Sequence, residues 1–143
     1  MNKQELIAKL NEDLSNEYTH MQFYLHSSIM VQGIIRDEIS EWLVDHAKSE
    51  FDHIQQFGKM IVGLGGVPTH IPKAFPNLTD PSEIMRYAHT LESEVVLNYA
   101  HRMEEIKESR ELDLTDSKYV HLFLEDQLLD SRGDLDEIKQ FLD

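Results

Sequence analysis

Apolar side chains recur every three or four residues through most of the chain, which is the period of an amphipathic helix. The first such stretch spans residues 3–32 without Gly or Pro and ends at Gly33, a residue type that often takes the left-handed position after a helix. The second stretch spans residues 37–64 and ends at Gly65 and Gly66. Because the turn at Gly33 is short, the pattern predicts two antiparallel neighbouring helices.

Residues 65–80 have no helical period and contain three of the four prolines, so we expect an extended connection there. A third helix is predicted from about Pro81, with Asp80 as its N-cap, to about residue 111. After a break at residues 112–115, a fourth helical pattern runs to the C-terminus.

Each predicted helix is about 40 Å long at a rise of ~1.5 Å per residue. The connection at residues 65–80 can extend over about 50 Å, which is enough to cross the whole length of such a bundle. We therefore expect a single all-α domain, residues 1–143, folded as a four-helix bundle with one long crossover between helices two and three.

A glutamate interrupts the apolar stripe of every predicted helix: Glu17, Glu50, Glu92 and Glu125. His53 follows Glu50 by three residues, which places both side chains on one helix face. Glu17 and Glu50 are separated by the same number of residues as Glu92 and Glu125, which indicates two related helical hairpins. The midpoint of the first pair falls in the predicted turn, so we expect Glu17 and Glu50 to face each other. In the second pair the match to the turn is looser.

Four ionised glutamates inside a bundle repel one another and lose their hydration, so they require protons or cations. A pair of divalent metal ions would satisfy them. Carboxylate and imidazole donors suit iron or manganese, with zinc as a substitute. The chain has no cysteine, so oxygen and imidazole nitrogen atoms would hold any metal.

The chain carries 27 acidic and 13 basic residues, which gives a net charge of −14. Such a charge does not favour binding to nucleic acid, which needs an exposed basic surface. No apolar run approaches the ~18 residues that a membrane span requires, and the N-terminus lacks the apolar core of a targeting signal. We therefore expect a cytoplasmic protein with no membrane or nucleic-acid partner.

The chain resembles the bacterioferritins of the ferritin-like superfamily over nearly its whole length. The resemblance is carried by Asn16-Glu17, Tyr24-Leu25-His26, Glu50-x-x-His53, Glu92 and Glu125. It implies that Glu17, Glu50, His53, Glu92 and Glu125 bind two iron ions, with Glu50 and Glu125 as bridges. It also implies that Tyr24 donates a hydrogen bond or an electron near that site.

The function implied by this resemblance is iron storage and detoxification. A ferroxidase centre within each subunit would oxidise Fe²⁺ with O₂ or H₂O₂, and a homo-oligomeric shell would store the ferric mineral. Two alternatives remain open. One is a peroxide-protecting mini-ferritin that resembles Dps but does not bind DNA, and the other is a di-metal oxidase or peroxidase that stores nothing.

The chain departs from the bacterioferritin pattern in three places. Leu128 stands where the family has a second Glu-x-x-His histidine, and His121 or His46 is a candidate replacement. Phe51 stands where the family has the haem-ligating methionine, so we do not expect haem. The fourth helix ends at about Asp143, with no fifth helix to line the channels of a 24-subunit cage, so a shell of 12 subunits is an alternative to one of 24.

Overall fold

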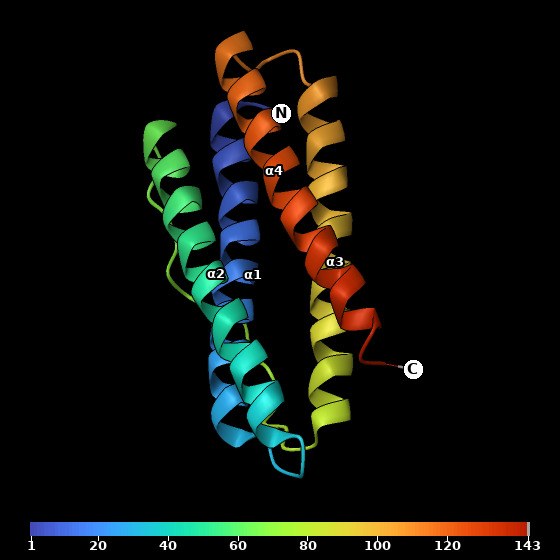
Figure 1. The fold of residues 1–143 in the computed structure, drawn as a ribbon. Coiled ribbons are helices and arrows are strands. Elements are labelled where there is room, and N and C mark those ends of the chain that lie inside the picture. The colour runs from blue at the N-terminus through green and yellow to red at the C-terminus, as the bar shows by residue number, and fades with distance from the viewer. Residues whose placement is uncertain (143) are drawn as a thin grey trace.

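A computed structural model describes residues 1–142 of the chain as a bundle of helices without strands (Figure 1). The helices are α1 (Lys3–Met30), α2 (Arg36–Gly63), α3 (Pro81–Glu108) and α4 (Leu114–Lys139). The prediction of an all-α four-helix bundle is confirmed. Within the described residues, no helix is apolar over a length that could cross a bilayer.

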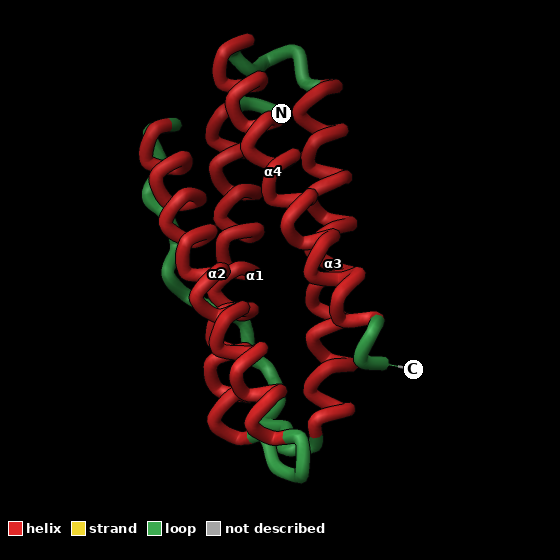
Figure 2. The backbone as a smooth tube through the Cα atoms, viewed as in Figure 1, coloured by secondary structure: helices red, strands yellow, loops and turns green. Residues whose placement is uncertain are grey.

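The chain order of the helices produces one long crossover. α1 and α2 form an antiparallel pair, and so do α3 and α4 (Figure 1). α2 and α3 run in the same direction, so residues 64–80 must travel back along the full length of the bundle. Figure 2 shows this loop beside the helices, and the predicted crossover between helices two and three is confirmed.

The crossover is held against α1 by a row of polar side chains. Asn11, Ser15 and Thr19 lie one turn apart on α1, and each makes a hydrogen bond of 2.7–2.8 Å to the backbone of residues 69–73. The regular spacing of these three residues therefore fixes an extended segment that has no secondary structure of its own.

The start of α3 agrees with the sequence-based prediction, whereas the end of α1 differs from it. Asp80 caps α3 as predicted, because its carboxylate accepts a backbone hydrogen bond from the first turn at 3.0 Å. The prediction that Gly33 directly follows the first helix is wrong, since α1 already ends at Met30, with Val31 as its C-cap. The backbone N–H of Gln32 leaves the helix to bind the carbonyl of Thr79 at 2.9 Å. Gly33, with φ +111°, then forms the turn itself.

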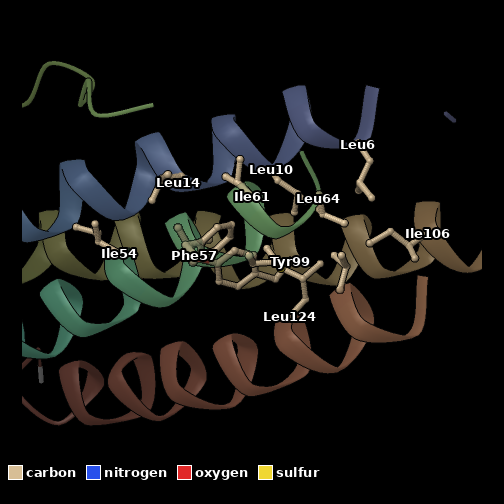
Figure 3. Packing of buried hydrophobic residues seen from close by; sticks show 13 residues of the cluster. Leu6, Leu10, Leu14, Ile54, Phe57, Ile61, Leu64, Tyr99, Ile106 and Leu124 are labelled. Carbon is tan, nitrogen blue, oxygen red and sulfur yellow. The ribbon is translucent and has the colours of Figure 1, made fainter. Parts of the chain in front are cut away.

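The buried apolar residues form two clusters, one toward each end of the bundle. The first contains Leu10, Phe57 and Tyr99 (Figure 3). The ring centroids of Phe57 and Tyr99 lie 6.2 Å apart. The second contains Phe23 and Leu43. Along each helix, buried polar residues separate the members of one cluster from those of the other. A polar layer therefore crosses the middle of the bundle.

Candidate metal centre

The polar layer contains six side chains that are between 0% and 6% exposed. They come from all four helices: Glu17 and His20 on α1, Glu50 and His53 on α2, Glu92 on α3 and Gln127 on α4. The spacing of three residues in the first two helices turns the glutamate and the histidine of each pair to the same side.

Each of these six residues has one buried nitrogen or oxygen atom that makes no hydrogen bond within residues 1–142. A buried polar atom without a partner costs roughly 1–3 kcal/mol, so six in one layer would strongly destabilise the fold unless something else binds them. The donor set of carboxylate, imidazole and amide groups fits divalent metal ions.

The donor atoms form two overlapping groups. Potential ligand atoms of Glu17, Glu50 and His53 all lie within 4.8 Å of one another, and so do those of His20, Glu50 and Glu92. Glu50 belongs to both groups. The arrangement therefore fits two metal ions that share the Glu50 carboxylate.

The structure brings together four of the five residues proposed as metal ligands from the sequence, namely Glu17, Glu50, His53 and Glu92. His20 was missed. A signal for it was present, because Glu17 and His20 have the same Glu-x-x-His spacing as Glu50 and His53.

The expectation that Glu125 points into the bundle is wrong, because its side chain is 51% exposed. α4 buries Leu124 and Gln127, and Glu125 comes one residue after Leu124, which is about 100° further around the helix. The turn between α3 and α4 is also centred near residue 111, so Asp130 rather than Glu125 lies level with Glu92. The face of Glu125 therefore excludes it from the layer, and Glu125 is also not level with Glu92.

Neither of the two candidate replacements for the missing α4 histidine reaches the centre. His121 lies 3.4 Å from Glu125 on the exposed side of α4. His46 lies one turn from Glu50 on α2, but its imidazole faces Asp134 on α4. The second buried imidazole is instead His20, on α1.

Two tyrosines connect the hairpins across the centre. The Tyr24 hydroxyl on α1 donates a 2.6 Å hydrogen bond to Glu92 on α3, and the Tyr99 hydroxyl on α3 donates one to Glu17 on α1. Burial, reinforced by the charge of the bonded glutamate, raises the pKa of both hydroxyls well above 10. Both tyrosines therefore stay protonated and orient one carboxylate oxygen each.

The buried charges raise the proton affinity of the centre. Burial and then the charge of Glu17 raise the pKa of Glu50 well above its usual value. Burial is the largest single effect on the pKa of His20 and lowers it, but the contributions of Glu92 and Glu17 together outweigh burial, so this pKa is also raised. Metal binding at these groups would displace protons, so metal affinity should rise with pH.

His53 has a partner outside the centre. Its Nε2 lies 3.1 Å from Asp130 Oδ2, and its Nδ1 lies 3.5 Å from Glu50 Oε2. When Nε2–H donates to Asp130, the lone pair of Nδ1 faces the carboxylates of Glu17 and Glu50. This is the orientation that a metal ligand requires. The sequence did not identify this partner.

Comparison with known proteins agrees with this geometry. The ferritin-like domain family matches residues 7–143. The chain belongs to this family. Its fold is similar to that of a ferritin-like diiron-carboxylate protein of Bacillus anthracis str. Ames, at 29% identity and a TM-score of 0.88 over 99% of this chain and 97% of the other. The bacterioferritin resemblance seen in the sequence therefore holds at the level of the ferritin-like family.

Two further ferritin-like structures share the fold at lower identity. A Dps protein of Vibrio cholerae O1 is 15% identical, with a TM-score of 0.88 over 99% of this chain and 91% of the other. A bacterioferritin of Rhodobacter capsulatus is 16% identical, with a TM-score of 0.84 over 97% and 84%. No curated protein sequence matches the chain at a significant level.

Proposed function

We propose that this ferritin-like chain is a cytoplasmic ferroxidase that oxidises Fe²⁺ and stores the ferric product in a homo-oligomeric shell. One observation supports the proposal above all others, namely that six buried polar atoms in one layer of the bundle make no hydrogen bond, and that five of the six residues gather into two overlapping groups of potential ligands. Two substrate ions bound there would share Glu50. Glu17 and His53 would complete one position, and His20 and Glu92 the other.

The surrounding residues would prepare the centre for this chemistry. Tyr24 and Tyr99 fix the carboxylate oxygens that they bind, and Asp130 fixes the His53 tautomer. Each of the two Fe²⁺ ions would give one electron to the oxidant. O₂ with two protons would then leave as H₂O₂, or H₂O₂ with two protons would leave as two water molecules. Manganese or zinc would compete for the same donors.

The storage part of the proposal depends on the assembly. The Dps and bacterioferritin neighbours have the same fold as this chain, so a shell of 12 or 24 subunits is the form that we propose. A Dps-like protective protein without DNA binding would use the same centre. Light-scattering mass combined with iron loading tests this part, and a monomer or dimer that retains no ferric mineral would overturn it.

The oxidation itself is tested by rapid mixing of Fe²⁺ with O₂. Glu50→Ala removes the carboxylate shared by both positions, so we expect the fast phase of oxidation to disappear. Glu125→Ala is the matched control, because it removes a carboxylate of the same kind from an exposed position. A fast phase that survives in Glu50→Ala at the wild-type rate would contradict the proposed centre.

A further inference from the structure

A second group of metal-binding side chains lies between α2 and α4, outside the buried centre. His46 Nε2 on α2 lies 3.3 Å from Asp134 Oδ1 and 3.9 Å from Glu137 Oε2, both on α4. Asp134 and Glu137 are three residues apart and therefore share one face of α4. The exposed fractions of the three side chains are 13%, 19% and 48%, so the group is open to solvent on one side.

We propose that His46, Asp134 and Glu137 form a divalent-cation site that is separate from the buried centre. Ligand atoms of all three residues lie within 4.8 Å of one another. Tetrahedral coordination at bond lengths of about 2.0–2.2 Å separates neighbouring ligand atoms by roughly 3.4 Å, which is close to the observed distances. One imidazole with two carboxylates suits Fe²⁺, Mn²⁺, Co²⁺ or Zn²⁺.

Trp42 holds two of the three ligand residues in position. The Nδ1–H of His46 donates a 2.8 Å hydrogen bond to the Trp42 carbonyl, so in neutral His46 the lone pair belongs to Nε2 and faces the carboxylates. The indole ring of Trp42 stacks on the imidazole, with ring centroids 3.7 Å apart and 22° between the planes.

The same indole also orients the acidic ligand on α4. Its Nε1–H donates a 2.6 Å hydrogen bond to Glu137 Oε1, and the other oxygen, Oε2, is the one that lies toward His46. Outer contacts of this kind orient ligands before a metal ion arrives. The group is therefore more than a chance gathering of acidic side chains on a surface.

Charge balance also favours a cation. A neutral His46 would point a lone pair at two carboxylates, and a protonated His46 would leave one negative charge uncompensated among the three groups. A divalent ion with neutral His46 balances both carboxylates. A proton on His46 is nevertheless the competing explanation, and the test must separate the two.

The position of this group suggests what the bound ion would do. The ring of Tyr24, whose hydroxyl binds Glu92 of the centre, lies 6.0 Å from the His46 ring and 5.9 Å from the Trp42 ring. One layer of aromatic side chains therefore separates the solvent-facing group from the buried one. A cation held at His46 would therefore lie next to the centre, with Tyr24 between the two sites.

Trp42 provides a direct test, because it is the single tryptophan of the chain. Co²⁺ quenches tryptophan emission at short range, so Co²⁺ added to the full-length Glu50→Ala protein at pH 7 should quench Trp42 in a saturable way, at one ion per chain. Adding His46→Gln should weaken the apparent Co²⁺ affinity by at least about tenfold. This background lacks the carboxylate shared by both buried positions, and the His46 variant is compared within it, so the result does not depend on the proposed ferroxidase.

Two further variants keep the test decisive. Glu137→Gln retains an acceptor for the Trp42 indole but removes a charged ligand, so it should weaken Co²⁺ binding even if His46→Gln disturbs the fold. His121→Gln is the matched control, since it removes an imidazole paired with one carboxylate on the exposed side of α4 and should change nothing. Quenching that is unchanged in both ligand variants, or emission that responds to pH but not to Co²⁺, would overturn the proposal.

Discussion

The two hairpins of the bundle share a pattern but contribute unequally to the centre. Glu17 and Tyr24 of the α1–α2 hairpin have equivalents in Glu92 and Tyr99 of the α3–α4 hairpin, and each tyrosine binds the glutamate of the other hairpin. The same separation in sequence that relates Glu17 to Glu92 can be applied to the other residues of the first hairpin. It pairs His20 with Val95, Glu50 with Glu125 and His53 with Leu128. The first hairpin therefore supplies four of the six buried donor residues.

The difference arises from the turns as well as from the residues. The centre of the turn after α1 falls at the midpoint in sequence of Glu17 and Glu50, so these two carboxylates lie level with each other. The turn after α3 is centred between two and three residues beyond the midpoint of Glu92 and Glu125, so the same spacing does not bring them together. A repeated sequence spacing thus gives a repeated site only when the turn repeats as well.

Metal removal should affect the two hairpins differently, and this is the largest effect we expect. An ion at 100 times its dissociation constant stabilises the fold by about 2.7 kcal/mol, so two ions contribute about 5 kcal/mol. Chelation should lower the melting temperature and increase amide hydrogen exchange, more in α1 and α2 than in α3 and α4. Equal increases in both hairpins would contradict the unequal contribution of ligands.

The second prediction makes the first hairpin resemble the second at one position. His20→Val introduces the residue found at the equivalent position 95 and removes a proposed ligand of the second ion. We expect the affinity for one of the two bound ions to fall by roughly 100-fold. Loss of a ligand should reduce metal affinity at least as much as loss of a residue that only hydrogen-bonds to a ligand. Calorimetric titration with Mn²⁺ measures this.

His101→Val is the control for that experiment, because it removes an exposed histidine from α3. It should retain both ions. If His20→Val also bound two ions with unchanged affinity, the pairing of His20 with Glu92 in the second position would be wrong.

The third prediction compares the two tyrosines that cross between the hairpins. Tyr24→Phe and Tyr99→Phe each release one carboxylate oxygen, so each should weaken binding of one ion by about tenfold. Tyr119→Phe, which changes an exposed tyrosine, should have no effect. An ion affinity that depends on only one of the two tyrosines would show that the crosswise arrangement is not functionally symmetric.

The smallest effect concerns the contact between Asp13 on α1 and Arg102 on α3. Burial raises the pKa of Asp13 to about 6, although Arg102 at 3.0 Å acts in the opposite direction. An acid with a raised folded pKa stabilises the fold at low pH, and this contribution is lost as the pH rises through the folded value. Metal-free protein should therefore be more stable at pH 5 than at pH 7, with roughly 1 kcal/mol from Asp13.

Asp13→Asn should reduce that pH dependence by the same amount, measured by urea unfolding at both pH values. The raised pKa values of Glu50 and His20 act in the same direction, so part of the dependence should remain. Metal-free protein that becomes more stable as the pH rises would contradict the sign of all three shifts.

The sequence by itself determined the helices, the crossover and much of the centre. Apolar period and the positions of Gly and Pro predict helix type without any knowledge of contacts, because both act within a few residues. The sequence also allowed four residues of the centre to be predicted, namely Glu17, Glu50, His53 and Glu92. A glutamate in an apolar stripe is costly wherever the helix packs, and His53 lies on the same helix face as Glu50.

Only the tertiary structure decided which α4 residue enters the centre. A shift of one residue rotates a side chain by about 100°, so the periodicity of α4 could not distinguish Glu125 from a buried position. The burial of Leu124 and Gln127 shows which face of α4 turns toward the other helices, and this face does not include Glu125. The contacts of Asp130 with His53 and of Trp42 with Glu137 join distant parts of the chain. No local pattern encodes them, because they depend on how whole helices pack.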